Sequence, residues 1–551
     1  MERIKERTFL EKIKGKENVQ DFFDWLLYDY EKRKDQGIPV LSMELWDIFN
    51  QTGSRAEYEK PYFEKRNFTV VLALLALFFP ERENFLALLK EYIRSTCDEY
   101  SWAVPAHCKE TGDDRTCVDL FASETACMLA EIVFLLEKDL GVELVNVIKA
   151  EITKRVFIPY SQNNYWWETG WNNWTSVCCG NIAIAMMRIA PNCFEREKER
   201  ILRSMSLYIN SFPDDGNCLE GLGYWHYGFG SWVWFADALY SYSNGAINLF
   251  QNDKVKNIAT YAQKMFLKGN VAVSIADSGI NAKGDTTLLA YLHERYPKNC
   301  LVPPKELSTY WDGNVSWIPK TRRILYGFDA KHELTLPQKN HFFKNAGQAI
   351  VNMDTYSLFV KAGHNDESHN HNDVGSFILS TDKGQIFCDL GAGKYFDGYF
   401  APEIRYTLLN TASWGHSVPI IDGKYQKAGA KFCGMISWKD NEIVVDFSKA
   451  YGDTEGKLVR KFRYENSRII MVDCWQGYKE VTERFITLKK PQIVADGVIV
   501  ENVKLTADKL VPVIKQYSYD GHGYSENKID AYTIDYVITK KETVLFTMEI
   551  L

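Results

Sequence analysis

Through roughly the first 310 residues, hydrophobic side chains recur at intervals of three and four. In VDLFASETACMLAEIVFLLEKDLG (118–141) this pattern runs to Gly141, which ends it. Its apolar positions are Leu120, Phe121, Met128, Leu129, Ile132, Leu135 and Leu136. The same spacing occurs over 18–33, 84–98, 179–190, 196–211, 229–243 and 253–268. Helices of this length joined by short polar loops predict antiparallel pairs, arranged as a bundle or as a toroid of hairpins.

After about residue 320 the hydrophobic period changes to two. SFILSTDKGQIFCDL (376–390) contains two strand-like runs around Asp382-Lys383-Gly384, a hairpin signal. Similar runs continue to the C-terminus and predict an antiparallel β-sandwich. The irregular, proline-containing segment 302–320 marks the predicted boundary between a helical domain, 1–315, and a sandwich domain, 316–551.

Composition narrows the functional classes. Hydrophobic residues make up 46% and charged residues 25%, as in a soluble globular protein, and the net charge of −7 argues against a nucleic-acid partner. The longest apolar run, FTVVLALLALFFP (68–80), is shorter than the ~20 residues that span a bilayer, so we expect a buried helix and no membrane partner. The charged N-terminus has no secretory signal pattern, which predicts a cytoplasmic protein with free cysteines. If a leader had already been removed from this sequence, the protein would instead be periplasmic or secreted.

Three of the ten histidines fall within one polar loop, GHNDESHNHND (363–373). His369 and His371 stand two residues apart, so on an extended segment they would point to one face. Two imidazoles and one carboxylate suit a divalent, zinc-like ion, and Asp389 and His416 follow in FCDLGAG and SWGHSVP. We therefore predict His371, Asp389 and His416 as metal ligands, which leaves His369 to face a ligand.

Two polar stretches of the helical half combine rings with hydrogen-bonding groups. YWWETGWNNWTSVCCGN (165–181) places Asn172 and Asn173 among tryptophans that include Trp174. Amides beside rings can bind a carboxylate or sugar hydroxyls, although asparagine also caps helices. DGNCLEGLGYWHYGFGSW (215–232) is rich in glycine, which lets backbone approach a ligand closely. It carries Glu220, Tyr224, His226 and Tyr227, and a tyrosine here could move a proton.

Together these stretches resemble the heparinase II/III group of polysaccharide lyases. The resemblance rests on NNW (172–174), EGLGYWHYG (220–228), HNHNDVGSF (369–377), FCDLGAGKY (387–395) and APEIRYTLLNTASWGHSVPIIDG (401–423), and it covers about residues 165 to 425. It implies an incomplete (α/α) toroid followed by an antiparallel β-sandwich, with the active site between them. It also implies β-elimination on a uronate-containing glycan such as heparin, heparan sulfate, chondroitin or alginate, and a homodimer is a reasonable expectation.

The family's functional positions carry over motif by motif. Asn173 matches the position that contacts the uronate carboxylate, Tyr227 the catalytic tyrosine and His369 the catalytic histidine. The zinc ligands of the family fall on the three residues selected above on chemical grounds, although His369 and His371 could exchange roles. Neighbours expected to contact substrate are Asn172, Trp174, Glu220, Tyr224, His226 and Arg405.

Two other classes of function compete with a lyase. A glycoside hydrolase on a helical toroid needs two carboxylates ~5–9.5 Å apart across the cleft, for which Glu168 and Glu220 are available. A non-catalytic glycan-binding protein with a structural metal would explain the rings and the histidines, but not Asn173 and Tyr227 in separate loops.

Overall fold

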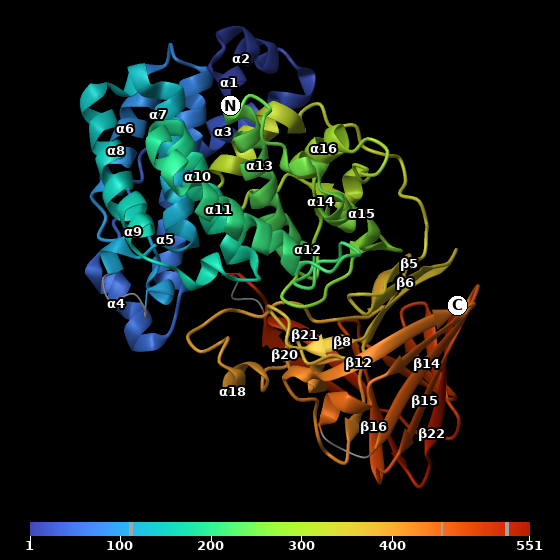
Figure 1. The fold of residues 1–551 in the computed structure, drawn as a ribbon. Helices are drawn as coiled ribbons and strands as arrows, with labels where there is room; N and C mark the ends of the chain where they lie inside the picture. The colour runs from blue at the N-terminus through green and yellow to red at the C-terminus, as the bar shows by residue number, and fades with distance from the viewer. Residues whose placement is uncertain (109–113, 453–455, 524–527) are drawn as a thin grey trace.

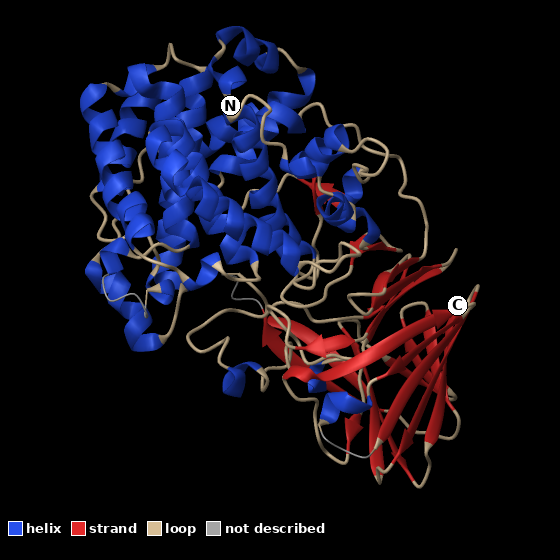
Figure 2. Ribbon diagram, in the orientation of Figure 1, coloured by secondary structure: helices blue, strands red, loops and turns tan. Residues whose placement is uncertain are grey.

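The computed structural model describes residues 1–108, 114–452, 456–523 and 528–551. Its N-terminal part is an incomplete (α/α) toroid and its C-terminal part an antiparallel β-sandwich, as Figures 1 and 2 show. The helices are α1 (Glu2–Lys5), α2 (Arg7–Lys14), α3 (Gln20–Arg33), α4 (Met43–Thr52), α5 (Ala56–Phe78), α6 (Glu83–Cys97), α7 (Leu120–Leu140), α8 (Val142–Ile152), α9 (Ile158–Gln162), α10 (Asn173–Ile189), α11 (Pro191–Ser211), α12 (Leu222–Tyr224), α13 (Gly230–Tyr242), α14 (Asp253–Ala259), α15 (Tyr261–Lys264), α16 (Thr286–Arg295), α17 (Trp317–Arg322) and α18 (Pro402–Arg405).

Helices α7 and α10 pack against each other in the core of the ring and carry site residues at their first turns. Each begins at a side-chain cap. Asp119 accepts a hydrogen bond from the Ala122 amide at 2.7 Å, and Asn172 accepts one from the Trp174 amide at 3.1 Å. Such caps satisfy backbone donors that the first helical turn leaves free. The apolar run 68–80 lies mostly in α5 and is buried through Phe78, as predicted.

The predicted helix 253–268 is wrong beyond Lys264 and is interrupted once before that. It breaks at Thr260 into α14 and α15, and its last residues form the short strand β1 (Phe266–Leu267), which pairs with β2 (Val271–Ala272). The segment 302–320 is also more than a linker, because β4 (Ser308–Thr309) pairs with β3 (Gly284–Asp285) and Trp317 is buried in the helical core. Helical turns continue past residue 315 and end with the π-helical turn Arg323–Gly327, whereas the domain boundary at 315 stays a prediction.

The sandwich strands are β5 (His341–Phe343), β6 (Gln348–Asn352), β7 (Tyr356–Lys361), β8 (Gly363–Asn365), β9 (Phe377–Thr381), β10 (Gly384–Phe387), β11 (Ile420–Ile421), β12 (Gly429–Lys439), β13 (Glu442–Asp446), β14 (Lys457–Glu465), β15 (Arg468–Gln476), β16 (Glu480–Thr487), β17 (Gln492–Val494), β18 (Gly497–Val500), β19 (Val503–Ala507), β20 (Val513–Asp520), β21 (Lys528–Thr539) and β22 (Thr543–Ile550). One sheet has nine strands in the order β17-β18-β19-β22-β15-β14-β13-β12-β8. The others have the orders β10-β9-β7-β6-β5 and β11-β16-β21-β20.

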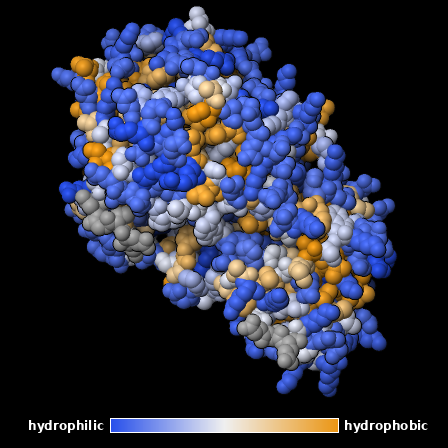
Figure 3. All heavy atoms as spheres, viewed as in Figure 1, coloured by the Kyte–Doolittle hydropathy of each residue, from blue (hydrophilic) through white to orange (hydrophobic). Residues whose placement is uncertain are grey.

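A shared apolar core joins these sheets. Phe485 of β16 meets Phe546 of β22 with ring centroids 5.0 Å apart, and Phe377 of β9 meets Phe462 of β14 at 5.3 Å. Hydrophilic residues cover most of the face of both domains seen in Figure 3. Within the described ranges, no helix combines the length and the apolar character needed to cross a membrane.

Candidate active site

A cleft of about 780 Å³ lies between the helical ring and the sandwich. The ring lines it with aromatic side chains, and the sandwich contributes the segment 394–401 and the histidine loop. Of the predicted site residues, the cleft wall contains Asn172, Asn173, Trp174, Tyr224, Tyr227 and His369. Four segments far apart in the sequence therefore converge on one cavity large enough for a short oligosaccharide.

Asn173 and His369 approach the same carboxylate. The Asn173 Nδ2 group donates to Glu220 Oε2 at 2.9 Å, and His369 Nε2 lies 3.7 Å from that oxygen. Burial raises the pKa of Glu220, while His369 opposes the rise. Glu220 is 8% exposed and does not line the cleft, and its carboxylate holds the amide and lies near the imidazole.

The backbone of His369 has φ +56°, in the left-handed region that few residues other than glycine adopt. The loop is therefore not the extended segment assumed from the HNH pattern. Its ring stacks on Tyr224, with centroids 3.8 Å apart and planes inclined by 23°. This stacking on Tyr224 holds the His369 imidazole at the surface of the cleft.

Tyr227 lies in a π-helical turn, Trp225–Phe229, that follows the glycine-rich stretch. Its ring packs near Trp311, at a centroid distance of 5.8 Å, and its hydroxyl makes no well-formed hydrogen bond within the described residues. Burial and the nearby Glu124 raise the pKa of Tyr227 well above its ordinary value of about 10. The phenol is thus protonated at neutral pH.

His371, Asp389 and His416 form a buried cluster whose ligand atoms all lie within 4.8 Å of one another. His371 Nδ1, Asp389 Oδ2 and His416 Nε2 make no hydrogen bond in the described structure, as expected for atoms that a cation would satisfy. The other nitrogen of His371 contacts Asp277 Oδ1 at 3.1 Å, the kind of second contact that orients metal-bound histidines. The predicted ligand set therefore fits a divalent metal.

Asp277, which the sequence reasoning missed, connects these two parts of the site. Its carboxylate contacts His369 Nδ1 at 2.9 Å as well as His371. It also accepts hydrogen bonds from Tyr395 at 3.0 Å, Tyr399 at 3.3 Å and Arg405 at 3.1 Å. Burial would raise the pKa of Asp277, but Arg405 and the histidines hold it well below its usual range.

Two other residues predicted to contact substrate, Arg405 and His226, do not line the cleft. Arg405 is buried behind the cleft, where its guanidinium donates to Asp277 and to the Asn370 carbonyl. His226 faces away from the cleft, and its Nε2 accepts a hydrogen bond from the Asp285 amide at 3.0 Å. Arg405 therefore holds the Asp277 carboxylate in place, and His226 holds the Asp285 backbone. A glycine-rich motif or a basic residue near a motif does not tell which way its side chains point.

Comparison with known proteins supports this architecture. Residues 335–473 match the family described as heparinase II/III-like, C-terminal. Among solved structures, a heparinase III is 17% identical with a TM-score of 0.60 and covers 90% of this chain and 78% of its own. The heparan sulfate lyase HepC from Pedobacter heparinus is 12% identical (TM-score 0.57; 95% and 87% covered). The chondroitin AC lyase of Streptomyces coelicolor A3 is 10% identical (TM-score 0.53; 92% and 78% covered). A comparison with curated protein sequences finds no match.

Proposed function

Because the chain carries a heparinase II/III-like C-terminal domain, we propose that it is a polysaccharide lyase that cleaves uronate-containing glycans by β-elimination. The observation that carries this proposal is the presence of Asn173, Tyr227 and His369 on the wall of one cleft. An amide, a phenol and an imidazole at one sugar-sized site are the groups that such an elimination requires.

The reaction begins at C5 of the uronate, whose hydrogen is acidified by the adjacent carboxyl group. Negative charge grows on that carboxyl group as C5 loses its proton, and the Asn173 amide donates to it. A preorganised donor of this kind is worth about 2.7–4 kcal/mol in oxyanion sites. His369 or Tyr227 takes the C5 proton, according to the epimer that is cut, and Tyr227 protonates the leaving O4. The product is a 4,5-unsaturated uronate, and no water is consumed.

The cluster of His371, Asp389 and His416 is proposed to hold zinc, which would join the histidine loop to the segments that follow β10 and precede β11. When bound, the ion supplies a structural link, because β-elimination needs no metal hydroxide. Asp277 then transmits the position of His371 to His369 through one carboxylate.

The two carboxylates that the glycoside hydrolase alternative requires are both engaged by other side chains. Glu168 is bound to Arg200 at 2.5 Å and also accepts a hydrogen bond from the Tyr165 amide, and it does not line the cleft. Glu220 is held by Asn173. Neither carboxylate is placed to serve as the acid or nucleophile of glycoside hydrolysis.

The test is incubation with a panel of uronate polymers and oligosaccharides while ultraviolet absorbance is recorded. A lyase produces a conjugated, unsaturated product that absorbs, whereas a hydrolase produces only new reducing ends and a binding protein produces neither. Absence of the absorbing product from every uronate would remove the proposal.

A further inference from the structure

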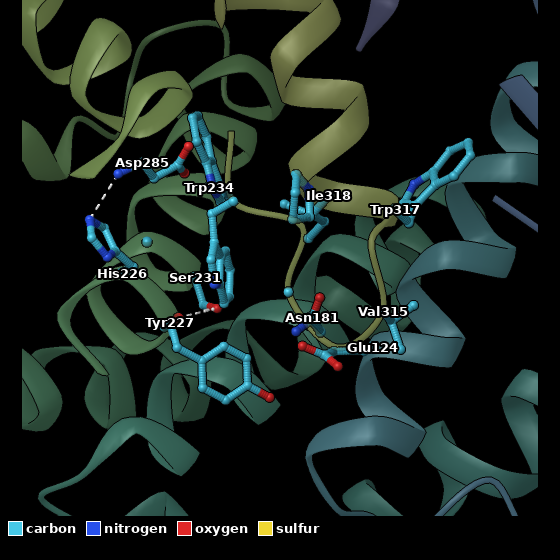
Figure 4. Close-up of a pocket in the computed structure, with 14 residues that line it drawn as sticks. Glu124, Asn181, His226, Tyr227, Ser231, Trp234, Asp285, Val315, Trp317 and Ile318 are labelled. Carbon is cyan, nitrogen blue, oxygen red and sulfur yellow. Dashed lines mark hydrogen bonds between the residues drawn. The ribbon is translucent and has the colours of Figure 1, made fainter. Parts of the chain in front are cut away.

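Tyr227 lines two cavities. One is the large cleft, and the other is a smaller, partly open cavity of about 30 Å³ inside the helical ring, shown in Figure 4. That volume has room for about two waters, since one water needs about 10–15 Å³ by this measure. The side of Tyr227 that faces away from substrate is therefore not packed solid.

Glu124 reaches this inner cavity from the second turn of α7 and does not line the cleft. Its carboxyl group lies beside the Tyr227 hydroxyl, as Figure 4 shows. Asn314 is a second neighbour of this hydroxyl. Glu124 Oε2 is sealed from solvent and has no hydrogen-bond partner in the described structure. Glu124 as a whole is half-buried, but a carboxyl group with one oxygen sealed from solvent and no paired cation is costly to ionise, so it is retained in its neutral form.

The titratable groups around Glu124 do not supply a compensating positive charge. They are Asp119 and Cys127 on the same helix, Cys178 of α10, Tyr227, and His226 and Asp285 across the cavity. Burial lowers the pKa of His226 to about 3, so this histidine is neutral at pH 7. Burial raises the pKa of Glu124 to about 8, with Tyr227 opposing the rise and Asp119 adding to it.

We propose that Glu124 is a positioning residue and proton reserve behind Tyr227, acting through the phenol without touching substrate. When Tyr227 gives its proton to the leaving sugar oxygen, the neutral Glu124 carboxyl group donates its O–H to the phenolate oxygen. The proton then passes from Glu124 to Tyr227. With His369 as the base, His369 releases the C5 proton to solvent and the Glu124 carboxylate takes one proton from solvent through the inner cavity, so all three residues and the net charge return to their starting state after one turnover.

This inference rests on the role of Tyr227 in the proposed lyase reaction, so its test includes one measurement that needs no substrate. Glu124→Gln preserves the shape of the side chain and a hydrogen-bond donor, but it can neither ionise nor deliver a proton. With wild-type protein, kcat falls as pH rises through about 8, because the carboxyl group becomes an anion beside the phenol. In Glu124→Gln we expect kcat at pH 7 to fall by about 10²-fold, and this basic limb to disappear.

Two variants control this experiment. Glu124→Asp keeps an ionisable group and should keep a basic limb with intermediate activity. Glu137→Gln lies on the exposed side of the same helix, where Glu137 pairs with Lys149, and should have the wild-type profile. An unchanged kcat and an unchanged basic limb in Glu124→Gln would overturn the inference.

The substrate-free measurement is NMR of the protein labelled at tyrosine Cζ, with the Tyr227 signal assigned by its loss in Tyr227→Phe. Removing the anion at position 124 should lower the pKa of Tyr227, so its signal should begin to titrate at lower pH in Glu124→Gln. A signal unchanged between the two proteins would show that Glu124 does not act on the phenol. This result stands even if no uronate is cleaved, and it thereby separates failure of the inference from failure of the proposed function.

Discussion

Asp277 Oδ2 lies 2.9 Å from His369 Nδ1, and these two residues come from different domains. The carboxylate is contributed by the helical ring and the imidazole by the histidine loop of the sandwich. A carboxylate at Nδ1 keeps the proton on that nitrogen, so Nε2 of His369 is the nitrogen left free to accept a proton. The docking of the two domains therefore sets the tautomer of the candidate base.

Asp277→Asn should reduce kcat strongly with substrates for which His369 is the base. The amide can present its N–H to His369 and favour the wrong tautomer, an error that lowers rate by on the order of 10⁴-fold in a serine protease triad. Activity is measured by product absorbance and metal content by elemental analysis. Asp382→Asn, on the exposed turn between β9 and β10, is the control. Wild-type activity in Asp277→Asn would show that its contact with His369 has no catalytic importance.

Tyr227→Phe should abolish formation of the unsaturated product and leave the fold intact. The hydroxyl makes no well-formed hydrogen bond in the described structure, so we expect its loss to cost little stability. A positioned proton transfer is worth about 10²–10⁴-fold in rate. Thermal unfolding verifies the fold, and Tyr425→Phe at an exposed position is the matched control. Retained turnover would take Tyr227 out of the reaction.

His416→Ala should lose bound metal and thermal stability together. Elemental analysis should find about one zinc per wild-type chain and little in the variant, because two ligands bind zinc weakly compared with three. Differential scanning calorimetry should find a lower Tm. His341→Ala, which changes a histidine on β5 outside the cluster, should retain the metal. Full metal occupancy in His416→Ala would contradict the assigned ligand set.

The charges of the cleft predict a preference for uronates with little sulfation. Among its described lining residues, the lysines and arginines are Arg55 and Lys394, and Arg55 is already bound to Glu59 at 2.5 Å. Burying a charged group without a partner costs about 1–3 kcal/mol or more of binding free energy. Each added sulfate on the substrate should therefore lower kcat/KM about tenfold or more. The measurement compares one backbone in unsulfated and heavily sulfated forms. Faster cleavage of the sulfated form would refute this prediction.

His226 should make the protein less stable in acid. Its pKa is about 3 in the folded chain because of burial, against 6.5 in the unfolded chain. Between these values the unfolded chain binds a proton that the folded chain does not, so the free energy of unfolding falls as pH decreases. At pH 5 this amounts to about 2 kcal/mol. Urea unfolding at pH 7 and 5 should show a smaller difference in His226→Gln; an equal difference would contradict the assignment.

The sequence patterns predicted the parts of the site that depend on local order. The strand pair around Asp382 was predicted from neighbouring residues, and the structure confirms it; the alternative that an asparagine of this stretch caps a helix holds for Asn172. The metal cluster was also predictable, because few side chains can bind zinc and they stood in short motifs. These inferences needed residue chemistry and chain position, and no knowledge of how the domains pack.

Asp277 and Arg405 show where such reasoning stops. Asp277 is 92 residues from His369 and 128 from Arg405 along the chain, and its own segment carries no recognisable motif. Arg405 appeared to be a basic residue available to an anionic ligand, yet that anion is an aspartate of the same protein. Partner choice at these positions is set by domain docking, which the local pattern of residues does not encode.

The Asp277 carboxylate has five bonding partners, all on the sandwich side of the domain boundary. Separate expression of residues 1–327 would leave this acid facing solvent, and expression of the remainder would leave His369 without its anchor. We expect neither fragment to have even weak lyase activity. A chimera that joins the helical ring to an unrelated domain should therefore be inactive unless it also includes the sandwich residues that contact Asp277.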